Sequence, residues 1–211
     1  MPAAAREVAV SVRCPRCALR FDAGMTHCPD CSALQPAFAY TIAAFDYVPP
    51  FDALILQVKQ SGRFGLAATL GGLLADAVAR DPRGLLPDTR LIPVPATRPA
   101  LRQRGFNPAG EIARAVGRRL GLGVLPSVVR VTDDGMGRQR MLSRSARLAR
   151  AGGRFGLHFG AGLHVQGFPV AVVDDVMTTG STMHSIAQVL HDAGAARVVA
   201  LVVARTPASR N

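Results

Sequence analysis

VAVVDDVMTTGST, residues 170–182, joins an apolar run to two adjacent aspartates and then to small hydroxyl residues around a glycine. A short apolar run bounded in this way predicts a strand buried on both faces, which is typical of a parallel sheet. In open α/β sheets, ligands bind at the carboxyl ends of the strands. The sequence therefore places Asp174 and Asp175 at a candidate binding site, followed by a helix over residues 181–194.

The loop after the aspartates has the features of a phosphate-binding turn. Gly180 permits a tight turn and a close backbone approach. Backbone amides and hydroxyl groups at a helix N-terminus can surround a phosphate without a lysine. The GK[ST] end of a Walker A loop is absent. The residues expected to contact the phosphate are Thr178, Thr179, Gly180, Ser181 and Thr182.

Two carboxylates beside a phosphate would repel it, so their presence needs a reason. Ribose hydroxyls provide one, because they donate hydrogen bonds to carboxylates. The alternative is that Asp174 and Asp175 only cap a turn next to a solvated loop. An all-apolar strand followed by this order of residues favours the sugar-phosphate interpretation.

Outward from this stretch, the apolar pattern predicts strands that alternate with helices. Strands are expected over 40–47, 89–95, 127–132, 168–175 and 196–205. Helices are expected over 51–60, 66–80, 107–121 and 181–194, with a short one around 143–150. Asn107 is the expected N-cap of the third helix, ahead of Pro108. This alternation predicts a doubly wound α/β sheet.

The cysteines form two CxxC pairs, CPRC and CPDC, separated by ten residues. Four thiolates at this spacing fit a closed tetrahedral Zn²⁺ site, which is structural rather than catalytic. Iron in a rubredoxin-like site and two redox CxxC motifs are the alternatives. We expect residues 1–37 to form a four-cysteine zinc module, with a linker at 34–38 and a second domain over 38–211. The expected ligands are Cys14, Cys17, Cys28 and Cys31.

The chain is basic, with 25 Lys and Arg against 14 Asp and Glu, and Lys59 is its only lysine. The excess of arginine reflects either codon bias or an anionic ligand such as nucleic acid or a polyphosphate. The absence of tryptophan and an aromatic content of 5% argue against base-stacking platforms. No apolar run has the length of a membrane span, and the start lacks a signal-peptide pattern. We therefore expect a cytoplasmic protein without membrane insertion.

Three segments resemble a known family. VVDDVMTTGST resembles the phosphoribosyl pyrophosphate (PRPP) signature of type I phosphoribosyltransferases. LIPVPATRPALRQRGFNPAGEIAR (91–114) and QRMLSRSAR (139–147) resemble two sequence blocks of the ComF/GntX competence family, in which a double-CxxC module also occurs. The resemblance implies a type I phosphoribosyltransferase fold, an open, mostly parallel sheet flanked by helices and covered by a hood, here over 133–154.

The resemblance also implies roles for individual residues. Asp174 and Asp175 would hold the ribose 2′ and 3′ hydroxyls, and Thr178–Thr182 the 5′-phosphate, with Val176 and Met177 in the same segment. Ala96, Thr97 and Arg98 would form the pyrophosphate loop. Further contacts to the anion would come from Lys59, Arg102, Arg104 and Arg144.

The activity implied by the resemblance is transfer of the phosphoribosyl group from PRPP, with Mg²⁺, to an unidentified acceptor in a process linked to DNA uptake. No residue stands out in the sequence as a general base. Two other hypotheses are a non-catalytic sensor of PRPP or nucleotides that docks onto the DNA-uptake machinery, and direct binding of single-stranded DNA through the arginine-rich surface.

Overall fold

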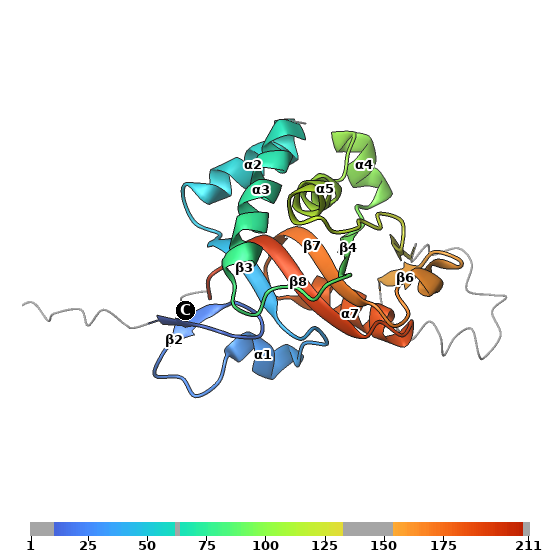
Figure 1. The fold of residues 1–211 in the computed structure, drawn as a ribbon. Coiled ribbons are helices and arrows are strands. Elements are labelled where there is room, and N and C mark those ends of the chain that lie inside the picture. Colours follow the sequence, from blue (N-terminus) through green and yellow to red (C-terminus); the bar gives the residue numbers. More distant parts are fainter. Residues whose placement is uncertain (1–10, 62–63, 133–153, 209–211) are drawn as a thin grey trace, which may run out of the picture.

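The computed structural model describes residues 11–61, 64–132 and 154–208 (Figure 1). The strands are β1 (Ser11–Arg13), β2 (Arg20–Asp22), β3 (Thr41–Asp46), β4 (Arg90–Pro93), β5 (Val129–Val131), β6 (Phe155–Leu157), β7 (Pro169–Met177) and β8 (Arg197–Arg205). The helices are α1 (Pro29–Leu34), α2 (Phe51–Ser61), α3 (Phe64–Arg80), α4 (Arg98–Arg104), α5 (Pro108–Leu120), the 3-10 helix η1 (Ala161–His164) and α7 (Ser181–Asp192). No helix in these ranges is both long and apolar enough to span a bilayer.

The central sheet has the strand order β3-β8-β7-β4, and all its pairings are parallel. This confirms the open parallel sheet predicted from the sequence. Pro93 of β4 pairs with Val173 of β7, so both strands end at the same edge of the sheet. Strand β7 continues for four residues beyond this pair, so the loop that follows β4 leaves the sheet next to the last part of β7.

One face of the sheet is covered by α2, α3 and α5 (Figure 1). Ala171 and Val173 of β7 pack into this core together with Leu74 of α3 and Ile112 of α5. Helices α3 and α5 come close at Gly71, where an added Cβ would lie 2.6 Å from Ala115 Cβ and 2.8 Å from Ile112 O. The glycine therefore sets the spacing between these two helices.

Gly71→Ala is expected to destabilise the fold by about 1–3 kcal/mol, because the new methyl group collides with backbone that cannot move freely. Gly72 lies beside it in α3 with no atom within 4 Å of its virtual Cβ, so it provides a matched control. Gly72→Ala is expected to stabilise the helix by about 0.5–1 kcal/mol. Urea denaturation of both variants measures the difference, and equal effects would contradict this account of the α3–α5 contact.

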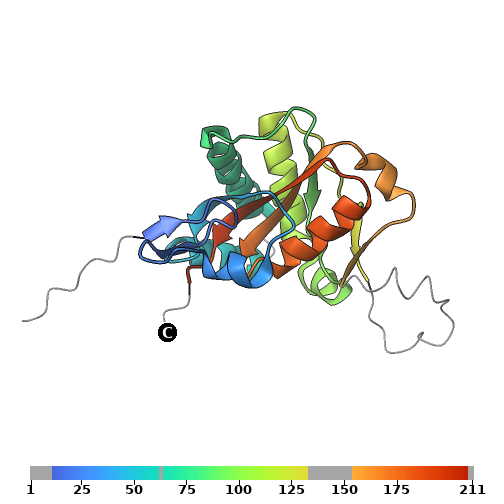
Figure 2. The same cartoon turned by 90° about the horizontal axis from the view of Figure 1, so that it is seen from below.

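The other face of the sheet is covered by α7 and by the cysteine-bearing segment (Figures 1 and 2). Val170 and Val172 face this core, which also contains Leu19, Phe38 and Ile186. A single long helix thus covers only part of this face, and the rest is covered by residues near the four cysteines and by residues of β5, β6 and η1. The predicted burial of β7 on both faces is confirmed.

The stretch expected as a linker, 34–38, is partly core. Phe38 is only 1% exposed, and the backbone N–H of Ala37 donates to Nδ1 of His184 in α7 at 3.1 Å. The linker prediction was wrong at these positions, because Phe38 packs against the sheet. The strand expected over 127–132 is β5, which pairs with β6 in an antiparallel hairpin. The short helix expected at 143–150 lies outside the described residues, as does most of the hood.

Candidate functional site

The acidic pair lies inside β7 rather than after it. The sequence predicted a strand ending at 175, but pairing with β8 continues through Val176 and Met177. Asp175 is 8% exposed, and Lys59 Nζ at the end of α2 lies 3.1 Å from its Oδ2. Each carboxylate also accepts a hydrogen bond from the next backbone amide in the chain, at 2.8 Å for Asp174 and 2.7 Å for Asp175. The structure thus places Lys59 beside the acidic pair, whereas the resemblance implies a contact to the anion.

The environment of Asp174 disfavours its ionised form. Burial raises the pKa of Asp174 well above its ordinary value, and the neighbouring Asp175 carboxylate raises it further. The backbone hydrogen bond from Asp175 and the charge of Lys59 lower this pKa without cancelling the rise. Two carboxylates held this close would be stabilised by a cation or by hydrogen-bond donors from a ligand.

Asp174→Asn is expected to raise the melting temperature at pH 7 by about 2–4 °C, which corresponds to about 1 kcal/mol. A raised native pKa means that the folded state loses stability as pH rises from the ordinary aspartate range to the raised pKa. The difference between the two proteins should therefore grow with pH and disappear where Asp174 is protonated in both states. Calorimetry at several pH values tests this, with the exposed Asp192→Asn as control; a variant less stable at pH 7 would contradict it.

The loop after β7 turns directly into α7. Gly180 has φ +82°, and an added Cβ would meet its nearest atoms at 3.7 Å, so it is the backbone conformation that requires glycine here. Its N-cap residue, Gly180, has no side chain to cap the helix, and Thr179 Oγ1 accepts from the N–H of Ser181, the first residue of α7, at 3.4 Å. The side chains of Thr178, Thr179 and Ser181 are exposed around this helix start. The segment therefore offers backbone N–H groups and hydroxyl groups at the positive end of a helix, as an anion site needs.

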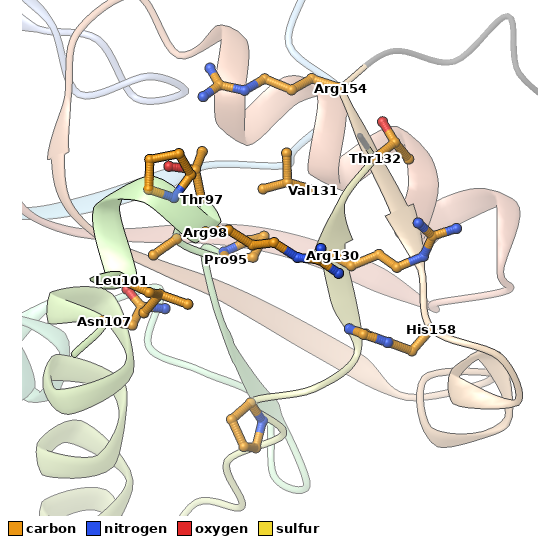
Figure 3. Close-up of a pocket in the computed structure, with 13 residues that line it drawn as sticks. Pro95, Thr97, Arg98, Leu101, Asn107, Arg130, Val131, Thr132, Arg154 and His158 are labelled. Carbon is orange, nitrogen blue, oxygen red and sulfur yellow. The ribbon is translucent and has the colours of Figure 1, made fainter. Parts of the chain in front are cut away.

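A cavity of about 950 Å³ opens beside the loop that follows β4 (Figure 3). Val94 N donates to Val173 O at 2.9 Å, so this loop leaves the sheet next to Asp174. Figure 3 shows Arg98 reaching from α4 toward β5. The lining residues that the structure describes include no Asp or Glu. They are Pro95, Ala96, Thr97, Arg98, Pro99, Leu101, Asn107, Pro126, Arg130, Val131, Thr132, Arg154 and His158.

The structure therefore groups some of the expected anion contacts and not others. Ala96, Thr97 and Arg98 line the cavity, but Arg102 and Arg104, in the last turn of α4, are not among its lining residues. Helix α4 itself was not predicted, and of its residues only Arg98 belongs to the expected pyrophosphate loop. Thr97 is its N-cap, and its hydroxyl accepts from Ala100 N. Arg144 lies outside the described residues.

Sequence reasoning missed the cavity residues contributed by the β5–β6 hairpin and its flanks. Arg130 and Thr132 belong to the strand predicted over 127–132, and Arg154 ends the arginine-rich stretch after it. The sequence shows the positive charges of the two arginines. It does not show that they line one cavity, because the cavity depends on the pairing of β5 with β6. His158 carried no sequence signal at all. Asn107 is the N-cap residue of α5, as expected, but its side chain donates to Val94 O at 2.9 Å and makes no capping hydrogen bond to the helix.

The four cysteines form a second candidate site, far from the cavity in the sequence. Their Sγ atoms all lie within 4.8 Å of one another, with 3.7 Å between Cys14 and Cys31 and 3.5 Å between Cys17 and Cys28. Four thiolates about 2.3 Å from a tetrahedral Zn²⁺ would lie about 3.8 Å apart. The cluster is therefore compatible with zinc, and all four corners are protein ligands.

Without a cation, the proximity of the thiols works against their ionisation. Burial, followed by the neighbouring Cys17 sulfur, raises the pKa of Cys28 to about 11, and the same causes raise the pKa of Cys31. Burial also acts to raise the pKa of Cys14, but hydrogen bonds from the backbone of Cys17 and Arg16 outweigh it and lower that pKa. A divalent cation removes this conflict because it stabilises all four thiolates at once.

Comparison with known proteins connects these features. The phosphoribosyl transferase domain family matches residues 100–211, slightly more than half of the chain, including β7, the following loop and α7. The chain belongs to this family. Its fold is thus the type I phosphoribosyltransferase fold expected from the sequence, with the cysteine cluster added at the N-terminal side.

Individual relatives place the chain more narrowly, in the ComF family. The DNA utilization protein YhgH of Salmonella typhi is 34% identical over 197 residues, covering 92% of this chain and 84% of the relative. Competence protein F of Haemophilus influenzae is 29% identical over 197 residues, covering 91% of this chain and 84% of the relative. The resemblance noted from the sequence is therefore confirmed.

Solved structures are more distant. The glutamine PRPP amidotransferase of B. subtilis is 18% identical, with a TM-score of 0.45 over 64% of this chain. This chain spans only 25% of the length of that enzyme.

Proposed function

We propose that this phosphoribosyltransferase-family protein binds PRPP and transfers its phosphoribosyl group to an acceptor, with release of pyrophosphate. The observation that carries the proposal is the arrangement of an acidic pair, a helix N-terminus and a basic cavity next to one another at one edge of the sheet. The acidic pair of β7 leads through Gly180 into the start of α7, and the basic cavity opens beside it after β4. A ribose that carries a phosphate at one end and a pyrophosphate at the other matches this order of groups.

Each part of the site has a role in this proposal. Asp174 and Asp175 accept hydrogen bonds from the ribose hydroxyls, which relieve the repulsion between the two carboxylates. The amides of residues 178–182 bind the 5′-phosphate at the start of α7. Arg98 and Lys59 face the pyrophosphate, which is the group with the greatest negative charge.

The reaction requires little covalent help from the protein. A lone pair on the acceptor forms a bond to C1′ while the C1′–O bond to pyrophosphate breaks and its electron pair leaves with the pyrophosphate. The acceptor's proton passes to a base, for which His158 is the imidazole among the described lining residues. The aspartate oxygens suit Mg²⁺, which when bound with PRPP would neutralise charge on the leaving group. Positioning and electrostatics then supply most of the acceleration.

Calorimetric titration of the zinc-loaded protein with PRPP, with and without Mg²⁺, tests this function. We expect Mg²⁺-dependent binding by the native protein and a loss of at least about 100-fold in affinity for Asp174→Asn/Asp175→Asn, because two ribose contacts disappear. Asp192→Asn, a change on the exposed side of α7, is the control and should bind normally. A well-folded native protein that does not bind PRPP would refute the proposal, and release of pyrophosphate distinguishes an enzyme from a sensor.

A second candidate function is binding of single-stranded DNA. The names of the relatives, DNA utilization protein and Competence protein F, favour it, and so does a cavity with Arg98, Arg130 and Arg154 and no acidic lining residue in the described chain. Fluorescence anisotropy with a labelled oligonucleotide at several salt concentrations measures it, since phosphate contacts give a steep salt dependence. Arg130→Gln/Arg154→Gln should weaken binding at least about tenfold, and unchanged affinity would count against DNA at this cavity.

The domain division predicted from the sequence belongs to the same proposal. Residues 1–37 would supply the metal-holding module, and residues 38–211 would supply the PRPP site. We also propose a role in DNA uptake, which the names DNA utilization protein and Competence protein F favour, and action in the cytoplasm.

A further inference from the structure

Arg205, the last residue of β8, is a charged side chain that is 1% exposed. Its guanidinium donates to backbone carbonyls in two distant parts of the chain. Nε donates to Cys17 O at 3.0 Å. Nη1 donates to Met177 O at 3.2 Å and also to Thr178 O. The remaining nitrogen, Nη2, forms an ion pair with the carboxylate of Asp30.

These partners belong to the two candidate sites. Cys17 is one of the four clustered cysteines, and Asp30 lies between Cys28 and Cys31. Met177 ends β7, and Thr178 begins the loop that leads into α7. A single planar side chain therefore joins the cysteine cluster to the start of the phosphate-binding loop.

The direction of these hydrogen bonds matters for the loop. In a trans peptide, the carbonyl of one residue and the N–H of the next point in opposite directions. When Arg205 holds the carbonyls of Met177 and Thr178, it therefore turns the N–H groups of Thr178 and Thr179 away from itself. Thr206 binds the same two carbonyls, through its N–H to Met177 O at 3.0 Å and its hydroxyl to Thr178 O at 3.4 Å. Arg205, which binds both carbonyls and also contacts the cysteine-bearing segment, thus helps to fix the direction of amides that an anion at this loop would need.

We propose that Arg205 is a positioning residue that links metal binding at the cysteine cluster to phosphate affinity at residues 178–182. The inference deepens the proposed function and rests on it for the identity of the ligand, PRPP. A metal that holds the four thiolates also fixes Cys17 O and Asp30, so the guanidinium has rigid partners on that side. By linkage, PRPP must tighten metal binding by the same factor by which metal tightens PRPP binding.

A second set of ion pairs provides a matched control. Arg13 and Arg20 pair with Asp46 at 2.7 Å and 2.6 Å, which ties the β1–β2 hairpin to the end of β3. These contacts also dock the cysteine-bearing segment onto the domain, but they do not touch residues 177–182. If docking alone mattered, Asp46→Asn would affect the loop as much as Asp30→Asn does.

Hydrogen exchange in the ligand-free, zinc-loaded protein tests the positioning role without PRPP. Asp30→Asn and Arg205→Lys are expected to speed exchange of the amides of residues 178–182 by about tenfold, since one ammonium cannot replace a five-donor guanidinium. Asp46→Asn should leave this exchange unchanged. Asp30→Asn and Arg205→Lys both keep a hydrogen-bonding group at the substituted position. Zinc content and melting curves establish that these two variants fold. Unchanged exchange in Asp30→Asn and Arg205→Lys, or the same acceleration in Asp46→Asn, would overturn the proposal.

PRPP titration and competition with a zinc chelator complete the test. We expect about tenfold weaker PRPP binding in Asp30→Asn than in the native protein, and tighter retention of zinc by the native protein at saturating PRPP. A native protein that binds PRPP with the same affinity when zinc is absent would refute the linkage. A native protein that does not bind PRPP at all would instead refute the proposed function, while hydrogen exchange still decides the role of Arg205.

Discussion

Replacing Arg205 by methionine is expected to lower the free energy of unfolding by about 3–5 kcal/mol, a large share of the roughly 5–15 kcal/mol that holds a typical domain together. The methionine fills similar space but donates no hydrogen bonds. The carbonyl of Cys17 then loses its guanidinium donor, and a buried acceptor left without one costs about 1–3 kcal/mol. Met177 O also loses the guanidinium but keeps a hydrogen bond from the N–H of Thr206 at 3.0 Å. Asp30 loses its cationic partner at the same time.

Urea denaturation measures this loss, and Arg20→Met provides the comparison. The Arg20 side chain is 46% exposed in its pair with Asp46, so its removal is expected to cost less than about 1 kcal/mol. Similar losses for the two variants would show that the Arg205 contacts contribute no more than a surface ion pair.

Removing the metal is expected to have the second large effect. The four cysteines lie on the sheet face that α7 covers only in part, and Cys14, Cys17 and Cys28 are members of that core. Structural zinc contributes about 10–16 kcal/mol of binding free energy in zinc-finger peptides. Without it, the segment that carries the cysteines loses its main constraint and uncovers apolar residues of β7 and β8. We expect the melting temperature to fall by more than about 10 °C, since about 1 kcal/mol corresponds to roughly 2–4 °C in a chain of this size.

Calorimetry before and after chelation, with a dye that binds exposed apolar surface, measures both consequences. Zn²⁺ should restore the original transition, whereas Mg²⁺ should not, because it prefers oxygen ligands. Cys31→Ser should reproduce the chelated state without chelator. An unchanged transition after complete metal removal would show that the packing of Leu19 and Phe38 suffices without the metal.

Much of the fold could be predicted because it depends on local patterns. The apolar run of β7 signals burial on both faces, and the structure divides its residues between the two cores. The paired CxxC motifs give the cysteine cluster, because a metal-binding spacing needs only a few turns of chain. Asp174, Asp175 and Gly180 were evident for a similar reason, since strand, acidic pair and turn are contiguous.

The parts that escaped prediction depend on contacts between distant segments. Pairing with β8 extends β7 through Met177, and residues 174–177 contain no local pattern that predicts this extension. Phe38 becomes core only because the sheet lies beneath it. Arg205 carried one visible signal, a charge at the end of an otherwise apolar strand, but its partners lie 175 and 188 residues away in the sequence. A single sequence does not show which of its many arginines meets such a set of partners.

The way the second face of the sheet is covered also constrains the order in which the chain can fold. The cysteine-bearing segment leaves the ribosome long before β7, α7 and β8, which form the surface it packs on. Contacts over such long separations form slowly, because loop closure precedes any gain from burial. During synthesis the apolar side chains of this segment therefore remain exposed to solvent until β7, α7 and β8 have been made. A metal bound early would keep the segment compact during that time. Limited zinc should accordingly reduce the yield of native protein during translation more than it affects protein that has already folded.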